Sequence, residues 1–297
     1  MNYQETFRTA LQSAWIIIKL VIPIYIIADI LYYYNVLEKV AFIFEPFTSL
    51  LGLPAEAALS IISGIFLNLY AAVAFAAPLD MTPHQWSVLA VFLGVCHSLI
   101  VENVIMKKLG ISNLYSYTLR FGGGLVIAWI AFQMPSEWFS ATVTSETFTQ
   151  KHYEDFTDLI TTSLSSALML TVKIILLISV LIFVMDWVKS RPFVKHSAKN
   201  VSKGFTITVG IILGITYGAG VLIKEKQSGA LSRDDIFYIG TFLMICHAII
   251  EDTLLFVIFG ADFSMVLGIR VLAALVVSWL FLILYRIGDK DENHTVQ

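Results

Sequence analysis

The feature that most constrains this chain is a series of apolar stretches, each about twenty residues long, that carry almost no charge. A helix of that length crosses the ~30 Å hydrocarbon core of a bilayer. Apolar residues make up 58% of the sequence and charged residues 14%, against ~45–50% and ~25% in soluble domains. A soluble helical protein would have to bury all of these stretches in one small core. The sequence therefore predicts an all-α polytopic membrane protein, with the lipid bilayer as its immediate partner.

The chain is also an internal duplication. A shift of 150 residues places the second half on the first without a gap over a long stretch. Polar landmarks coincide as well as apolar ones, namely Cys96-His97 with Cys246-His247, Glu102 with Asp252, Gly110 with Gly260, and Arg120 with Arg270. Shared hydrophobicity alone would not align polar residues. We therefore expect a first repeat over residues 1–135, a connector over 136–161 and a second repeat over 162–297.

Each repeat is expected to contain about four transmembrane helices. The predicted spans are Ser13–Tyr33, Ala55–Ala77, Gln85–Leu109 and Leu114–Gln133, then Thr162–Val188, Phe205–Ile223, Asp235–Phe259 and Ser264–Arg286. Two less apolar stretches, Asn35–Leu53 and Lys189–Lys203, are expected to form interfacial segments along the membrane surface. Thr82 with Gln85, and Ser232 with Asp235, have the spacing of a helix-start capping box.

The distribution of charge predicts the orientation. Lys189–Lys203 contains five basic residues and no acid, whereas the connector over 136–161 is acidic. Basic segments stay in the cytoplasm, so we expect the connector to be external in a multi-pass protein of the inner, cytoplasmic membrane. Four spans in each repeat would make the repeats parallel and place both termini outside. A re-entrant segment would instead make the repeats inverted, an arrangement that transporters also use.

Several functional classes find no support. The net charge is −3 and no basic run resembles a nucleic-acid patch. The two cysteines lie in apolar stretches, so no disulfide framework is indicated. No nucleophile–base motif and no cofactor motif is present, so we expect neither an enzyme nor a bound cofactor. The sequence leaves homo-oligomerisation open.

Charged side chains within the spans are the first candidates for function, because charge inside a bilayer is costly. Glu102 and Arg120 lie nine residues before and after Ile111, where the chain turns, so they reach equal depth on facing helices. Asp252 and Arg270 bracket Ala261 in the same way. We predict one structural ion pair in each repeat. Four further charged residues lie nearer the span ends or have long side chains and are expected to snorkel to the interface, namely Lys19, Asp29, Lys173 and Asp186.

The Cys-His pairs are the second set of candidates. Cys96, His97, Cys246 and His247 lie near the middle of related spans, where an imidazole needs a partner. We predict that His97 and His247 approach each other across the repeat interface and border a polar cavity. Asn68, which follows Gly64, and Glu251, four residues after His247, are further candidates for the substrate pathway. The four Cys and His side chains could together bind Fe²⁺ or Zn²⁺, although no CxxC or HExxH spacing is present.

The pattern of Gly64, Asn68, His97, Glu102-Asn103, Gly110 and Arg120 resembles the Gate domain, also called the nucleoside recognition domain. That domain occurs in concentrative nucleoside transporters, in the membrane part of ferrous-iron transport protein B, in spore maturation proteins and in uncharacterised two-Gate chains of about this length. The resemblance covers about Leu53–Gln133 and Gly204–Tyr285. The chain has no GTPase domain and no counterpart of the nucleoside-contacting hairpins. The resemblance therefore implies membrane transport without implying nucleosides as the substrate.

These observations predict a transporter or permease for a small solute or ion, with a midplane site between the two repeats. Two alternatives remain open at the level of sequence. The first is transport of a divalent transition metal such as Fe²⁺ or Zn²⁺. The second is a non-transporting membrane protein that assembles or regulates a partner, in which case the buried polar groups would all pair with one another.

Overall fold

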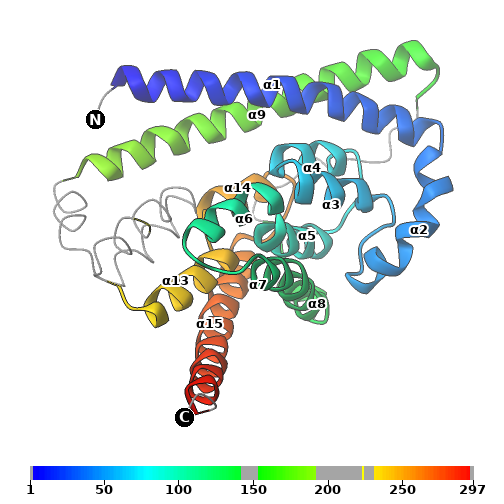
Figure 1. Ribbon diagram of the computed structural model, residues 1–297. Coiled ribbons are helices and arrows are strands. Elements are labelled where there is room, and N and C mark those ends of the chain that lie inside the picture. The colour runs from blue at the N-terminus through cyan, green and yellow to red at the C-terminus, as the bar shows by residue number, and fades with distance from the viewer. Residues whose placement is uncertain (1–2, 142–152, 192–222, 224–230, 295–297) are drawn as a thin grey trace.

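The computed structural model describes residues 3–141, 153–191, 223 and 231–294, and these residues are helical with short connections (Figure 1). Five helical segments are long and apolar enough to cross a membrane: Tyr3–Tyr33, Pro83–Lys108, Phe156–Val188, Arg233–Val257 and Phe263–Ile287. The prediction of an all-α polytopic membrane protein is confirmed.

The longest helices, α1 (Tyr3–Tyr33) and α9 (Phe156–Ser190), pack against each other as an antiparallel pair (Figure 1). At one end the Thr6 hydroxyl donates to Asp186 at 2.8 Å, and at the other end the Ser163 hydroxyl donates to Asp29 at 2.6 Å. Ser163 and Asp186 each follow their counterparts, Thr6 and Asp29, by 157 residues. The two hydrogen bonds are therefore related by the duplication, with a longer offset than in the rest of the chain.

Asp29 and Asp186, which were expected to snorkel to the interface, both accept hydrogen bonds from the partner helix. Asp29 is buried and also accepts from the Tyr153 hydroxyl at 3.0 Å. A carboxylate inside a helix pair retains hydrogen bonds that it would otherwise seek in the headgroup region. The sequence alone could not identify these partners, because the donors lie more than a hundred residues away in the chain.

A separate helix, α2 (Val36–Leu50), follows α1 after a turn in which Asn35 adopts a left-handed conformation, with φ 52°. This helix covers most of the segment Asn35–Leu53, which was predicted to be interfacial. In the second repeat, α9 extends through Ser190, and the remainder of the basic segment Lys189–Lys203 lies outside the described residues from 192 onward.

The predicted span Ala55–Ala77 is not one helix. It folds back on itself as a hairpin of two short helices, α3 (Ala57–Phe66) and α4 (Leu69–Ala76). A β-carbon on Gly64 would lie 3.1 Å from the Ala72 side chain, although eight residues in a straight helix span about 12 Å. Helices of ten and eight residues are too short to cross a bilayer. The counterpart Phe205–Ile223 lies outside the described residues, apart from Ile223.

The third predicted span of each repeat is a helix that breaks in its middle. In the first repeat α5 (Pro83–Cys96) is followed by α6 (Leu99–Lys108), and in the second α13 (Arg233–Ile245) is followed by α14 (Ile249–Val257). Both α5 and α13 start with the predicted capping boxes, Thr82 with Gln85 and Ser232 with Asp235.

The fourth span of the first repeat consists of α7 (Asn113–Tyr117), a π-helical turn η1 (Thr118–Gly123) and α8 (Gly124–Phe132). Its counterpart in the second repeat is the uninterrupted helix α15 (Phe263–His294). A short 3₁₀ turn, η2 (Ser136–Trp138), begins the connector. The remainder of the predicted external connector is described only in part.

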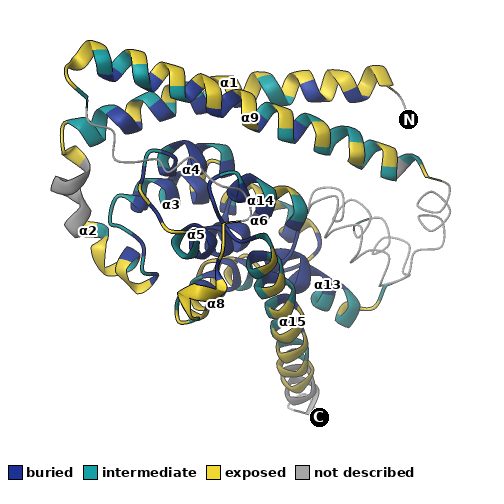
Figure 2. Cartoon of the chain, turned by 180° about the vertical axis from the view of Figure 1, so that it is seen from behind, coloured by how far each residue is buried: buried dark blue, intermediate teal, exposed yellow. Residues whose placement is uncertain are grey.

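The broken helices form the centre of the protein, the α1–α9 pair passes along one side of them, and α15 extends away on the opposite side (Figure 2). In the most apolar window of each segment, 72% of residues are buried in Pro83–Lys108 and 78% in Arg233–Val257, but only 22% in Phe263–Ile287. Large apolar side chains such as Trp15, Leu176 and Trp279 face outward from the surrounding helices. Such faces suit contact with lipid.

The broken helices of the two repeats run antiparallel, a direction that favours inverted repeats over the parallel ones expected from four spans in each repeat. The start of α5 packs on the turn after α14, where Trp86 stacks on Phe259 and the Asp262 N–H donates to the Ser87 hydroxyl at 2.8 Å. Conversely, the start of α13 packs on the turn after α6. The corresponding helices therefore run in opposite directions. The hairpin accounts for this difference, because two helices too short to cross a bilayer replace the crossing that the sequence predicted over Ala55–Ala77.

Candidate functional site

The helix breaks place His97 and His247 at the centre of the protein. In the first repeat α5 ends at Cys96, His97 has an extended backbone, and Ser98 is left-handed with φ 46°. In the second repeat Ala248 is left-handed with φ 44°. A non-glycine residue in this region costs about 1–2 kcal/mol. Because the two left-handed residues are equivalent in the duplication, the break is a feature of both repeats, and such strain often accompanies function.

Each break frees backbone carbonyl groups at a helix C-terminus, and an arginine from the following helix hydrogen-bonds to them. Arg120 donates from Nε to the Val95 carbonyl at 2.9 Å and from Nη2 to the His97 carbonyl at 2.7 Å. Arg270 donates from Nε to the Ile245 carbonyl at 3.4 Å and from Nη2 to the His247 carbonyl at 3.0 Å. A cation at a helix C-terminus also interacts favourably with the helix dipole.

The same arginines make the two predicted ion pairs. Arg120 Nη2 lies 2.6 Å from Glu102 Oε2, and Arg270 Nη2 lies 3.2 Å from Asp252 Oδ2. All four residues are buried. The prediction of one ion pair in each repeat is confirmed, and each arginine joins the two halves of its broken helix.

The two histidines meet across the repeat interface, with ring centroids 5.2 Å apart. Nδ1 of His97 lies 2.8 Å from the Leu93 carbonyl, and Nδ1 of His247 lies 2.8 Å from the Leu243 carbonyl. A carbonyl oxygen only accepts hydrogen bonds, so each Nδ1 carries a proton. The predicted approach of the two rings is confirmed, and each ring is oriented by its own repeat.

The Nε2 atoms of the two histidines face the carboxylates. Nε2 of His97 lies 3.2 Å from Glu102 Oε1, and Nε2 of His247 lies 3.2 Å from Glu102 Oε2. In a neutral imidazole with a proton on Nδ1, Nε2 is a lone pair. Two such lone pairs would repel the carboxylate, so these contacts call for a positive charge, supplied either by a proton on an imidazole or by a bound cation.

Other buried atoms at this site also lack hydrogen-bond partners. They include Nη1 of both arginines, and Nε2 of His247, whose 3.2 Å contact with Glu102 Oε2 is an ion-pair distance without hydrogen-bond geometry. Asn103 Oδ1 and Thr253 Oγ1, which follow the two carboxylates at equivalent positions, are unsatisfied as well. Buried polar groups are normally paired, and a concentration of unpaired ones is typical of a place that receives a ligand.

The hairpin supports the first break and carries one of the predicted pathway residues. The Ser98 N–H donates to the Gly64 carbonyl at 2.9 Å, and the Ser98 hydroxyl donates to the Leu67 carbonyl at 3.1 Å. The side chain of Asn68 caps α4 by accepting from the Ala71 N–H at 3.0 Å. Asn68 therefore terminates a helix directly beside the break, a role that accounts for its amide oxygen without a substrate.

Glu251 also contacts the hairpin, because the Tyr70 hydroxyl lies 3.3 Å from Glu251 Oε1. This contact joins α4 of the first repeat to α14 of the second. The equivalent of Glu251 in the first repeat is Val101, an exposed apolar residue. The two sides of the site therefore differ in charge.

The two cysteines do not join the histidines. Cys96 and Cys246 are buried free thiols, and the His-containing group within 4.8 Å consists of His97, His247 and Asp252 among the described residues. Cys96 packs toward α8, where a β-carbon on Gly124 would lie 3.7 Å from its own β-carbon. The prediction of a ligand set with two histidines and two cysteines is therefore wrong. The helix ends at each Cys-His pair, so neighbouring side chains leave in different directions.

One contact across the repeats was not foreseen from the sequence. Arg270 Nη2 donates to the Gly94 carbonyl at 2.7 Å, so the arginine of the second repeat also binds the broken helix of the first. A β-carbon on Gly94 would lie 2.7 Å from the Arg270 guanidinium carbon. The equivalent of Gly94 is Met244, so the duplication gave no signal for this contact.

Asp262 is another residue that the sequence interpretation missed. Its Oδ1 accepts from the Met265 N–H at 2.9 Å, and its Oδ2 accepts from the Ser140 N–H at 3.0 Å. It therefore caps the start of α15 and holds the connector. The equivalent residue, Ser112, caps α7 by accepting from the Tyr115 N–H at 3.2 Å. Two capping residues at equivalent positions could have been found by aligning the repeats.

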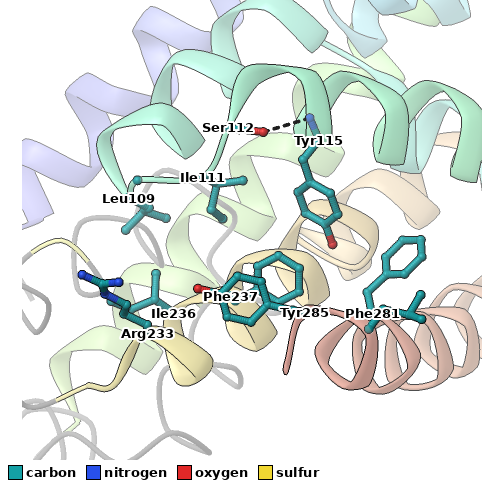
Figure 3. A pocket seen from close by; sticks show the side chains of 11 residues that line it. Leu109, Ile111, Ser112, Tyr115, Arg233, Ile236, Phe237, Phe281 and Tyr285 are labelled. Atoms are coloured by element: carbon teal, nitrogen blue, oxygen red, sulfur yellow. Dashed lines mark hydrogen bonds between the residues drawn. The ribbon is translucent and has the colours of Figure 1, made fainter. Parts of the chain in front are cut away.

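A cavity of about 720 Å³ lies beside the turn after α6, between the start of α13 and the end of α15 (Figure 3). Tyr115, Phe237, Phe281 and Tyr285 form its aromatic walls, and Arg233 lies at one side. None of the predicted pathway residues lines this cavity. The polar cavity that we expected at the histidines therefore does not coincide with it.

Comparison with known proteins supports the broad class of the chain. No protein-family model matches it, and no solved structure matches it. A protein named uncharacterized membrane protein YvoD, from Bacillus subtilis (strain 168), is 29% identical over 282 residues, which cover 90% of this chain and 89% of that protein. The similarity thus extends over both repeats.

This chain is a multi-pass membrane protein. The long apolar helices and the full-length similarity to a membrane protein agree on this class.

Proposed function

We propose that the chain is a transporter of the cytoplasmic membrane whose substrate site lies between the two inverted repeats. The observation that carries the proposal is the meeting of two broken helices, with His97 and His247 at the breaks and their rings 5.2 Å apart. In many transporters the site lies at a repeat interface, where interrupted helices expose backbone groups and polar side chains near the bilayer midplane.

The charged side chains support the same interpretation. Arg120 and Arg270 are fully buried, which is costly in a segment that only anchors a protein in lipid. The unsatisfied atoms at the site disfavour the alternative of a non-transporting assembly protein, which would pair all of its buried polar groups. The resemblance to Gate domains belongs to this proposal, as does the expectation that the protein is a carrier and not an enzyme.

Transport is tested with purified protein in proteoliposomes. Uptake would be measured for a panel of radiolabelled nucleosides and of divalent metals, because the sequence left both classes open. We expect uptake of one class, and we expect His97→Ala and His247→Ala to abolish it while the protein remains monodisperse. His84→Ala is the matched control, because His84 contacts the Ala131 carbonyl away from the site. If both site variants take up a substrate at the wild-type rate, the proposed site is contradicted.

A further inference from the structure

We propose that His97, His247 and Asp252 bind a divalent transition-metal ion, with Nε2 of each imidazole and one oxygen of the carboxylate as ligands. One ligand atom of each of these three residues lies within 4.8 Å of the other two, and all three residues are buried. This inference names the substrate class of the proposed transporter and in that respect rests on the proposed function. The evidence for binding stands independently of transport.

The orientation of the two rings is the first argument. In metal sites the non-ligating nitrogen of histidine almost always donates to a carbonyl or carboxylate, which fixes the tautomer and leaves the other nitrogen for the metal. Both histidines have this arrangement, with Nδ1 2.8 Å from the Leu93 and Leu243 carbonyls. The backbone of each broken helix thus directs an Nε2 lone pair toward the same point.

The unsatisfied atoms are the second argument. Nε2 of His247, in a residue only 2% exposed, faces Glu102 Oε2 at 3.2 Å without making a hydrogen bond to it. A buried acceptor beside a carboxylate remains unfavourable until a cation lies between them. Transition-metal bonds to nitrogen and oxygen are about 2.0–2.2 Å long, so tetrahedral ligands lie about 3.3–3.5 Å apart. The ligand atoms of His97, His247 and Asp252 lie within 4.8 Å of one another, so a small inward movement of the side chains brings them to this spacing.

The charge of the site is the third argument. Glu102 and Asp252 are balanced by Arg120 and Arg270 in the two ion pairs. Glu251, next to Asp252 in the chain, contacts a tyrosine hydroxyl and no cation at that oxygen. Glu251 is exposed and lies outside the group of His97, His247 and Asp252, but as a further carboxylate next to Asp252 it favours the approach of a cation.

The ligand types select the class of cation. Imidazole nitrogen suits Zn²⁺, Fe²⁺, Co²⁺ and Ni²⁺, whereas Mg²⁺ and Ca²⁺ prefer sites made of oxygen alone. Three protein ligands leave a fourth position for water or for Glu102. An incomplete coordination shell also suits an ion that must be released.

Binding is tested with Co²⁺ and Zn²⁺ on the purified full-length protein in detergent. Co²⁺ in a site with nitrogen and oxygen ligands absorbs visible light, and Zn²⁺ should displace it in a one-to-one titration. We expect His97→Ala and His247→Ala each to weaken Zn²⁺ binding at least tenfold. His84→Ala, and the double variant Cys96→Ser with Cys246→Ser, should leave binding unchanged. Size-exclusion profiles identify variants that fail to fold, and the conservative change His247→Gln provides a second test of the same ligand.

Two results separate this inference from the proposed function. If the wild-type protein binds neither Co²⁺ nor Zn²⁺ at micromolar concentrations, the metal site is wrong, and transport of an organic solute is still tested by the nucleoside panel. If Zn²⁺ binds through both histidines but does not enter proteoliposomes, the metal site stands and transport of this metal fails. Binding that depends on the cysteines and not on the histidines would also overturn the inference.

Discussion

His247 of the second repeat lies 3.2 Å from the carboxylate of Glu102 in the first, and the same carboxylate makes a 2.6 Å ion pair with Arg120. Glu102 therefore connects the internal ion pair of one repeat to the histidine of the other. A single residue here supports both the stability of its own repeat and the geometry of the interface.

Removal of the Glu102 charge should destabilise the protein strongly. Glu102→Gln leaves the Arg120 guanidinium buried without its counter-ion, and such changes cost about 3–5 kcal/mol. We expect a lower melting temperature in detergent and reduced expression. The double variant Glu102→Gln with Arg120→Gln should recover part of the loss, because it leaves no buried charge.

The matched control for this prediction is the exposed ion pair between Arg286 and Asp234, whose side chains are 58% and 36% exposed. Exposed pairs contribute about 0–1 kcal/mol, so Asp234→Asn should change the melting temperature little. If Glu102→Gln and Asp234→Asn lower the melting temperature equally, burial does not explain the effect of removing the Glu102 charge.

Gly94 should not tolerate a larger side chain. Gly94→Ala places a β-carbon 2.7 Å from the Arg270 guanidinium carbon, which would displace an arginine that bonds to both repeats. Overpacking of this kind costs about 1–3 kcal/mol. Gly268→Ala is the control, because no atom lies within 4 Å of its β-carbon and alanine favours a helix by about 0.5–1 kcal/mol. Melting temperatures should fall for the first variant and stay level or rise for the second.

The inverted arrangement predicts a topology that differs from the one expected from sequence. The turn before α5 and the turn before α13 must lie on opposite sides of the membrane, whereas parallel repeats would put both outside. In a variant without native cysteines, Asp80→Cys should react with an impermeant maleimide from outside, and Arg233→Cys should react only after permeabilisation. Labelling of both positions from outside would restore the parallel arrangement.

The inverted arrangement also predicts that both ends of the chain lie on the same side as the C-terminal ends of α6 and α9. Basic segments remain in the cytoplasm, so green fluorescent protein fused to the C-terminus should fluoresce. A C-terminal alkaline phosphatase fusion should be inactive, because that enzyme folds only outside the cytoplasm. The opposite pair of results would mean that α15 ends outside.

The sequence predicted the features that depend on local pattern. The capping boxes at Thr82 and Ser232 are present, and the ion pairs follow from equal spacing about a turn. The duplication also placed His97 and His247 at related positions, and related positions of two repeats meet at the symmetry axis. These predictions needed only helix geometry and the cost of buried charge.

The features that the sequence did not predict depend on where a helix stops in the absence of Pro or Gly at the break. The residues at the breaks are Leu67, His97 and Ala248, and none of these residue types normally ends a helix. The sequence therefore indicates a single span over Ala55–Ala77. The breaks are stabilised by distant groups, such as Arg120 at the His97 carbonyl. Once the hairpin was taken as a crossing, the count of spans became even and the repeats were expected to be parallel.

The capping residue Asp262 should make stability depend on pH. Burial raises the pKa of this carboxyl, but hydrogen bonds from Met265, Ser264 and Ser140 outweigh it, so the net pKa lies below the ordinary value. A lowered pKa contributes stability above the unfolded value of about 4, and this contribution is lost as the pH falls through the folded value. At pH 7, Asp262→Asn should reduce stability by about 0.5–2 kcal/mol, the usual effect of losing a cap.

The measurement is the difference in melting temperature between wild type and Asp262→Asn in detergent from pH 7 to pH 3. We expect a constant difference down to about pH 5 and a smaller one below about pH 4, because the wild-type carboxyl then protonates. Ser112→Ala removes the equivalent cap of α7, which does not titrate, so its effect should not change with pH. A difference for Asp262→Asn that grows on acidification would mean that the folded protein holds this carboxyl in its neutral form.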